Sequence, residues 1–181
     1  MKYMFASDIH GDVACAERMK QAFLEEKADK LILLGDLLYH GPRNDLPAHY
    51  APKEVIPLLN GMKERLICVR GNCDTEVDQM VLDFPILADY IVLPVGRVNA
   101  YITHGHRYHP DAPLPLMPRD VLIGGHTHIP ACRPFGENNL YLNPGSVSLP
   151  KENTPRSYMT LEDTTFRIRS FEGEILYTVT L

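Results

Sequence analysis

Polar side chains that can bind metal ions recur directly after the apolar runs of this chain. Asp8 and His10 follow the first apolar run, and Asp36 follows the second. Three later runs are followed by Arg70-Gly71-Asn72-Cys73-Asp74, by His104-Gly105-His106 and by Gly124-Gly125-His126-Thr127-His128. Carboxylates, an amide and imidazoles make up this set, and it needs no thiolate. Such a set suits Mn, Fe or Zn better than Ca or Mg, which prefer all-oxygen sites.

The number and spacing of these residues favour two ions rather than one. Asp8 and His10 are two residues apart, as are His126 and His128, and in extended backbone that spacing puts each pair on one face. The set has too many ligands for one tetrahedral ion but suits two ions that share a bridging carboxylate. Two divalent ions beside two aspartates leave a local positive charge that attracts phosphate despite the net charge of −5. Paired metal ions suit in-line displacement at phosphorus.

Alternating strands and helices are predicted in the first half, where they would position these residues. Apolar runs predict strands at 2–6, 31–34 and 66–69, and helical patterns predict helices at 13–27 and 52–59. Ala16, Met19 and Phe23 share one face of the first helix, Asp12 suits its N-cap, and Pro52 suits the first turn of the second helix. In open α/β sheets, ligands bind beyond the carboxyl ends of the strands, where the polar residues fall.

The second half has strand signals and no convincing helix. Strands are predicted at 90–95, 98–103, 121–123, 140–142, 158–161, 166–171 and 175–180. Gly96-Arg97 and Glu172-Gly173 are expected to close hairpins. A βαβαβ half followed by a largely antiparallel half predicts two sheets packed face to face with helices outside. Long proline-containing loops at 37–51 and 106–119 are typical of functional segments.

Length, composition and charge narrow the class of protein. A chain of 181 residues predicts one domain, 1–181, and 45% hydrophobic with 23% charged residues is typical of globular proteins. The net charge of −5 gives no general attraction to nucleic acid or to an anionic membrane, and no run approaches the ~18 apolar residues of a membrane helix. The four cysteines form no C-x-x-C pair, which indicates reduced thiols in a cytoplasmic protein. Assembly into a homo-oligomer is compatible with this sequence.

Five motifs in order carry a family resemblance. They are D-x-H from Asp8, G-D at Asp36, G-N-C-D from Gly71, T-H-G-H around His104 and G-H-T-H around His126. With them the chain resembles the calcineurin-like metallophosphoesterase superfamily. The strings G-D-L-L-Y-H-G-P-R-N, E-V-D-Q-M and N-P-G-S-V-S resemble more closely the small bacterial YfcE-type phosphodiesterases. The resemblance weakens after about residue 156 and implies a four-layer α/β/β/α sandwich of two packed mixed β-sheets flanked by helices.

The resemblance also implies the metal ligands. One ion would be held by Asp8, His10, Asp36 and His128, and the other by Asn72, His104 and His126, with Asp36 as the bridge. We expect Mn²⁺, with Fe or Zn as alternatives. The turn at 143–148 is expected to support the histidine loop without binding metal.

Further residues of these motifs are candidates for catalysis and substrate binding. Asn72 and His104 are expected to be catalytic as well as metal-ligating, and Asp74 to orient its turn or a ligand. His106 is either a solvated surface residue or a partner in proton transfer. Arg70 either pairs with a surface carboxylate or contacts phosphate, and Arg43 is a second candidate for substrate binding.

Cys73 departs from the superfamily pattern, in which many members carry a histidine that protonates the leaving group. A thiol with a pKa of ~8.5 is neutral at pH 7 and supplies no imidazolium charge. We therefore expect a phosphodiesterase that hydrolyses a small phosphodiester by attack of a metal-bound hydroxide. The alternatives are a phosphomonoesterase or nuclease of the same superfamily, or a non-catalytic scaffold on the same fold. Every ligand position is filled, which favours an enzyme over a scaffold. The sequence shows no basic track lined by aromatic residues, which a nuclease would use to bind its substrate.

Overall fold

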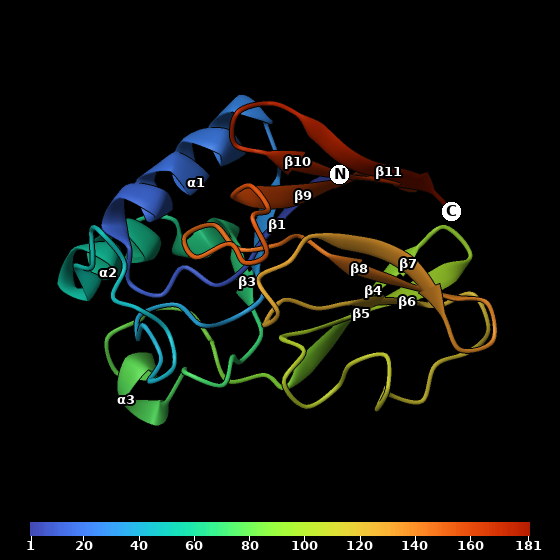
Figure 1. Ribbon diagram of the computed structural model, residues 1–181, viewed down its shortest axis with the longest axis horizontal. Helices are drawn as coiled ribbons and strands as arrows, with labels where there is room; N and C mark the ends of the chain where they lie inside the picture. The colour runs from blue at the N-terminus through green and yellow to red at the C-terminus, as the bar shows by residue number, and fades with distance from the viewer.

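Two mixed β-sheets packed face to face form the centre of the protein in the computed structural model, which describes residues 1–181 (Figure 1). The first sheet has the strand order β11 (Ile175–Thr180), β10 (Thr165–Ser170), β9 (Ser157–Glu162), β1 (Lys2–Ala6), β2 (Lys30–Leu33) and β3 (Leu66–Cys68). The second has the order β4 (Tyr90–Val95), β5 (Val98–Thr103), β6 (Val121–Ile123), β8 (Asn139–Asn143) and β7 (Ala131–Phe135). The two packed mixed sheets confirm the expected fold class.

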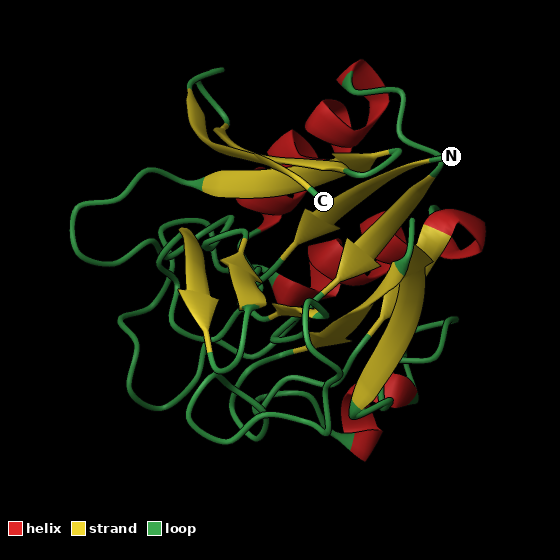
Figure 2. Ribbon diagram, turned by 90° about the vertical axis from the view of Figure 1, so that its right-hand side faces the viewer, coloured by secondary structure: helices red, strands yellow, loops and turns green.

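Helices cover the outer face of the six-stranded sheet. Helix α1 (Val13–Glu25) begins as predicted, because the Asp12 side chain accepts a hydrogen bond from the Cys15 amide at 2.9 Å. Helix α2 (Pro52–Asn60) follows, with the 3₁₀ turn η1 (Lys63–Arg65) and the short helix α3 (Glu76–Gln79). Met19 of α1 and Leu59 of α2 belong to one apolar core with Met4 of β1. Figure 2 shows helices gathered behind the strands. No helix is both long and apolar enough to cross a membrane.

The outer side of the five-stranded sheet carries a loop where the four-layer expectation placed helices. Leu122 faces this side, since its neighbours Val121 and Ile123 face the other sheet, and Leu122 is fully buried. The loop between β5 and β6 runs along this side in Figure 1. Asp120 fastens the end of the loop, because its carboxylate accepts from the amide of Met117 at 3.0 Å. The fourth layer of the sandwich is therefore this loop.

The strand connections differ from the prediction of a largely antiparallel second half. Strands β5, β6 and β8 pair in parallel, and only β4 and β7 pair antiparallel in that sheet. The last three strands return to the first sheet, where β9 pairs antiparallel with β1. Both expected hairpins are present, and β7 is an additional strand. Pro134 inside β7 masks the strand signal, because proline is confined to edge strands, and β7 is one.

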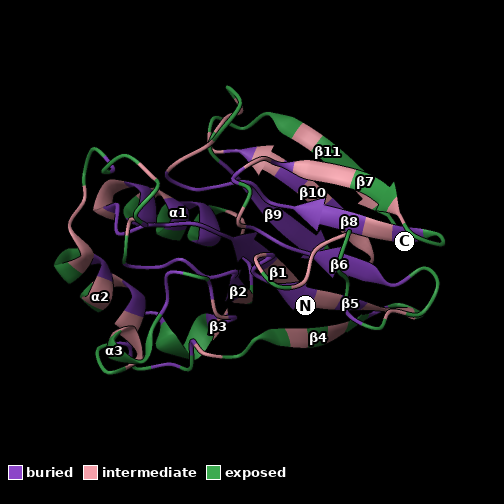
Figure 3. Ribbon diagram, turned by 60° about the horizontal axis from the view of Figure 1, so that its bottom comes forward, coloured by how far each residue is buried: buried purple, intermediate pink, exposed green.

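The faces between the sheets form a second apolar core. Phe5 and Ile32 of the first sheet pack there with Ile102, Val121 and Leu142 of the second. Figure 3 shows buried residues along the central strands β1, β6 and β9 and more exposed ones on the edge strands β4 and β11. Because the sheets are held in this way, the loops after β1, β2, β3, β5 and β6 meet at one edge of the molecule.

Candidate metal centre

The loops that follow five strands bring the candidate ligands together. Asp8 and His10 follow β1, Asp36 follows β2, Asn72 follows β3, His104 follows β5, and His126 and His128 follow β6. Five of these side chains are buried, His126 is half-buried and Asn72 is exposed. Charged and imidazole groups are rarely buried without partners, so the cluster requires an explanation in its chemistry.

Most of these residues have left-handed backbone conformations. Asp8 has φ 60°, His10 49°, Asp36 56°, His126 64° and His128 62°. The expectation that extended backbone puts each i, i+2 pair on one face is therefore wrong. Positive φ is uncommon for residues other than glycine, and it is found where the surrounding structure enforces it, often at functional sites. Sharp turns after each strand, rather than strand pleating, direct these side chains inward.

One group of possible metal ligands contains Asp8, His10 and His128. The His128 Nε2 atom lies 3.3 Å from Asp8 Oδ1 and 3.3 Å from His10 Nε2. His10 Nδ1 donates to the Tyr39 carbonyl at 2.8 Å and His128 Nδ1 donates to the Leu149 carbonyl at 2.6 Å. Each Nε2 of a neutral ring is then an acceptor, so these two atoms cannot hydrogen bond to each other. Asp8 Oδ1, also buried, has no hydrogen-bond partner. The three atoms together fit a bound cation.

A second group contains Asp36, His104 and His126. His104 Nδ1 donates to the Leu34 carbonyl at 2.7 Å, which again turns Nε2 toward the centre. That Nε2 lies 3.4 Å from Asp36 Oδ2 and 3.0 Å from Asn72 Oδ1. Imidazoles fixed by a backbone carbonyl behind them are the usual arrangement of histidine ligands.

Asp36 lies between the two groups. Its Oδ2 is 3.7 Å from His10 Nε2 in the first group and 3.4 Å from His104 Nε2 in the second. Its Oδ1 accepts from the Cys73 amide at 2.8 Å. Asp36, His10 and Cys73 also offer atoms within 4.8 Å of one another. Asp36 therefore presents one carboxylate oxygen to a histidine of each group.

Charges in the cluster support metal binding at neutral pH. Burial alone would raise the pKa of Asp8 and Asp36, but the neighbouring histidines outweigh it and hold both pKa values below the usual range. Burial and the nearby His104 lower the pKa of His126 to about 4, so His126 is neutral and has a free ring nitrogen. Burial opposes the charged form of His104, yet its bond to Asp36 raises its pKa to about 9. A cation bound there would displace that proton.

The turn from Asn143 to Ser148 supports the loops from behind, as expected. The Asn143 side-chain amide donates to the Gly125 carbonyl at 2.8 Å and to Thr127 Oγ1 at 3.0 Å. Ser146 and Ser148 donate to the Asp8 carbonyl at 2.9 Å and 2.8 Å. Packing around the loop is tight as well, since a Cβ on Gly125 would come within 1.9 Å of the Ser7 hydroxyl at the end of β1. The turn thus fixes the loops that carry Asp8, His126 and His128.

Asp74 and Arg70 stabilise the turn that carries Asn72. The Asp74 carboxylate accepts from the amides of Asp36 at 2.8 Å, Leu37 at 2.9 Å and Gly71 at 2.8 Å. Arg70 Nε donates to the Asp74 carbonyl, and its guanidinium lies 3.7 Å from a Glu76 carboxylate. The structure thus places Asp74 behind the cluster in an orienting position and Arg70 in a pairing with a surface carboxylate.

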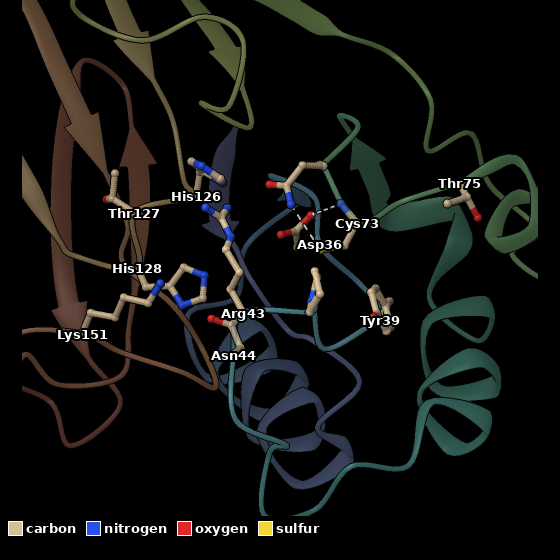
Figure 4. A pocket seen from close by; sticks show the side chains of 13 residues that line it. Asp36, Tyr39, Arg43, Asn44, Cys73, Thr75, His126, Thr127, His128 and Lys151 are labelled. Atoms are coloured by element: carbon tan, nitrogen blue, oxygen red, sulfur yellow. Dashed lines mark hydrogen bonds between the residues drawn. The ribbon is translucent and has the colours of Figure 1, made fainter.

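A pocket of about 610 Å³ opens over the cluster (Figure 4). Its lining combines cluster residues with two cationic side chains, Arg43 and Lys151, and includes Cys73. His106 does not line it; its ring centroid lies 5.4 Å from that of His104, and its buried Nδ1 has no hydrogen-bond partner. Sequence reasoning missed Lys151. The available signal was its place just after the N-P-G-S-V-S string, whose turn supports the metal loops.

Comparisons with known proteins agree with this geometry. The model of the calcineurin-like phosphoesterase superfamily domain matches residues 1–165. Phosphodiesterase YfcE of Escherichia coli strain K12 is 47% identical over 163 residues, which are 90% of this chain and 88% of the relative. The probable metallophosphoesterase YsnB of Bacillus subtilis is 28% identical over 142 residues, 74% of this chain and 78% of the relative. The solved structure of YfcE, a phosphoesterase from E. coli, superposes with a TM-score of 0.95 at 44% identity over 99% of both chains. The chain therefore belongs to the calcineurin-like phosphoesterase superfamily.

Proposed function

We propose that this protein is a metal-dependent phosphodiesterase with two divalent ions. The observation that carries the proposal is the pair of histidine Nε2 acceptors, from His10 and His128, held 3.3 Å apart beside the unpartnered Asp8 Oδ1. A cation is the partner that satisfies all three atoms. The second group around Asp36 repeats the arrangement.

The residues present fit two ions that share Asp36. One ion would be held by Asp8, His10, Asp36 and His128, and the other by Asn72, His104, His126 and the same Asp36. The mixture of carboxylate, amide and imidazole ligands suits Mn²⁺, with Fe or Zn as alternatives. The free cysteines fit a reducing compartment, and we place the protein in the cytoplasm.

The chain's own residues bind and orient a phosphodiester at this site. Two divalent ions held there would supply positive charge for the phosphoryl oxygens and would lower the pKa of a water molecule toward neutrality. Asn72 lines the pocket and positions the reacting phosphoryl group, and the buried His104 acts beneath it, with its Nε2 3.0 Å from Asn72 Oδ1. Arg43 projects into the pocket and contacts the phosphoryl oxygens of the substrate.

The chain supplies no strong acid for the leaving group. Burial and the charge of Asp36 raise the pKa of the Cys73 thiol, which stays neutral and is a poor proton donor at neutral pH. His106 is held behind His104, and burial together with the His104 charge lowers the pKa of His106. Diesters with a weakly basic leaving group are therefore the preferred substrates.

The test compares two chromogenic esters that release the same p-nitrophenolate. The protein is stripped with a chelator, reloaded with Mn²⁺, and assayed with bis(p-nitrophenyl) phosphate and with p-nitrophenyl phosphate. Turnover of the diester that depends on added metal and exceeds turnover of the monoester is expected. Faster turnover of the monoester would make the protein a phosphomonoesterase, and tight metal binding without turnover of either ester would favour a scaffold.

A further inference from the structure

Two cationic side chains project over the metal cluster without a protein counter-ion. Arg43 comes from the loop after β2 and Lys151 from the loop before β9, and both line the pocket. Figure 4 shows Arg43 directed toward His126 and Lys151 directed toward His128. Neither side chain forms a hydrogen bond or an ion pair, whereas the nearby Arg70 is paired with a carboxylate. The two charges are free for a ligand.

The backbone holds Lys151 at the rim of the pocket. Its amide donates to the carbonyl of His128 at 3.3 Å, and its own carbonyl accepts from the Thr154 amide at 3.1 Å and hydroxyl at 2.7 Å. Two residues earlier, the Leu149 carbonyl accepts from His128 Nδ1. One short segment therefore fixes both the His128 ring and the starting point of the lysine side chain.

The Arg43 loop is held against the cluster from the other side. The side-chain amide of Asn44 donates to the His40 carbonyl at 2.8 Å. Gly41 has φ +82°, and a Cβ there would lie 3.3 Å from Cys73 Sγ and 3.9 Å from the His10 ring. The backbone therefore passes close over the cluster just before Arg43, which places the two cations on opposite loops of one pocket.

The charge of the site exceeds what a simple diester offers. With two divalent ions, Asp8 and Asp36 leave two uncompensated positive charges, and Arg43 and Lys151 add two more. A phosphodiester group carries one negative charge, which the ions and Arg43 already meet. We propose that the substrate of this enzyme carries a second anionic group, a phosphate or a carboxylate, on one of its arms, and that Lys151, whose charge the diester group does not meet, selects it. This inference rests on the proposed phosphodiesterase function.

The test uses two diesters that differ only in that second anion. Thymidine 5′-(p-nitrophenyl phosphate) and its 3′-phosphorylated form share nucleoside, scissile bond and leaving group. With the Mn²⁺-loaded protein, kcat/KM for the phosphorylated form is expected to be higher by about tenfold, which a charge-assisted hydrogen bond supplies. Lys151→Gln should bring the ratio of the two kcat/KM values close to one. Arg97→Gln, an exposed arginine at the β4–β5 turn outside the pocket, is the matched control and should leave the ratio unchanged.

A binding measurement separates failure of this inference from failure of the proposed function. Isothermal titration of the same loaded protein compares thymidine 3′,5′-bisphosphate with thymidine 5′-phosphate, and Lys151→Gln should abolish the preference for the bisphosphate. The inference would be overturned if the two diesters had equal kcat/KM values, or if Lys151→Gln lowered kcat/KM by the same factor for both. Either result would leave the proposed phosphodiesterase function intact. If neither thymidine diester is hydrolysed and bis(p-nitrophenyl) phosphate is not hydrolysed either, the proposed function fails. The titration then decides the second-anion subsite by itself, because equal affinities overturn it and a Lys151-dependent preference supports it.

Discussion

Among the single residues of the site, Asp36 is the one that contacts both groups of possible metal ligands. Its Oδ2 faces a histidine of each group, at 3.4 Å and 3.7 Å, and its Oδ1 holds the Cys73 amide. Asp36→Asn keeps the shape of the side chain but removes the negative charge from both proposed ions. We expect the metal content to fall from two equivalents to below one. Elemental mass spectrometry after chelation and reloading measures it.

His126→Ala is the comparison for this change, because His126 belongs to the second group only. We expect that variant to keep about one equivalent. An Asp36→Asn protein that holds as much metal as the unaltered protein would disprove the shared position.

Because Cys73 is a poor proton donor, we expect the protein to release only weakly basic leaving groups efficiently. Cys73→His places an imidazole in the pocket, and general acid catalysis is typically worth ~10²–10⁴-fold. We expect alkyl phosphomonoester hydrolysis to rise at least about tenfold, with a smaller change for bis(p-nitrophenyl) phosphate, measured as steady-state kcat/KM. Equal rates for alkyl monoesters and activated diesters in the unaltered protein would show instead that another group, such as His106, already donates the proton.

Residue types and their order were sufficient to predict the cluster, but its local geometry was not. Asp8, His10, His126 and His128 were identified by chemistry and motif, and the structure brings all four together. Their left-handed conformations are not visible in sequence, because such strain is imposed by distant hydrogen bonds such as those from Ser146 and Ser148. Lys151 was missed for a related reason, since its position depends on a bond to the His128 carbonyl.

At the scale of elements, the turn from Asn143 to Ser148 does the most to position the site. Asn143→Ala removes bonds to the Gly125 carbonyl and to Thr127, and it leaves the buried Gly145 amide, which donates to Asn143 Oδ1 at 2.8 Å, without an acceptor. The free energy of unfolding is expected to fall by roughly 1–3 kcal/mol in urea titrations, the cost of an unsatisfied buried group. Metal affinity should fall too, because His126 and His128 lie in the loop that this turn supports.

Gln21→Ala on the exposed face of α1 serves as the control for Asn143→Ala. Gln21 bonds only to the exposed Glu25 side chain, so the change should lie within about 0.5 kcal/mol. Unchanged metal affinity in Asn143→Ala would show that the histidine loop keeps its shape without the turn.

Elements with a clear period were predicted well, and those set by tertiary context were not. Helix α1 has apolar residues at the spacing of one buried face, and strand β1 is a short apolar run buried on both faces. The starting residues of both elements agree with the prediction. Strand β7 contains a proline and lies at a sheet edge, so its pairing comes from β8 rather than from its own sequence. The order of strands in a sheet depends on which distant segments pair, as β1 and β9 do.

In the molecule as a whole, the Glu26 side chain connects the helical layer to strands of the first sheet. At the end of α1, its carboxylate accepts from Lys2 at 2.7 Å, from Tyr158 at 2.8 Å and from Arg169 at 2.7 Å. Burial alone would raise the pKa of Glu26, but these three donors outweigh it and lower that pKa. Glu26 therefore contributes stability that is fully present above the unfolded pKa of ~4.3 and is lost as pH falls through the lower folded pKa.

Glu26→Gln should reduce the free energy of unfolding at pH 7 and make it less dependent on pH between about pH 5 and pH 3. Hydrogen bonds to charged groups are worth about 1.5–3 kcal/mol each in favourable cases, so a loss of at least about 1 kcal/mol is expected. Urea titrations at several pH values measure both effects. A variant whose stability falls as steeply with acid as that of the unaltered protein would show that other carboxylates cause the loss.

The bonds from Ser146 and Ser148 to the Asp8 carbonyl span 138 and 140 residues of the chain. β1 likewise finds its antiparallel neighbour only at Ser157–Glu162. During synthesis, the first strand must therefore wait until residues as far as Glu162 have left the ribosome before its pairing and its loop take their final form. Contacts this distant slow folding, because the chain entropy of closing the loop is lost before the contacts form. An unfinished polypeptide that stops before Ser146 would lack the supports of Asp8, so the cluster would take its final form only after Ser148 has been made.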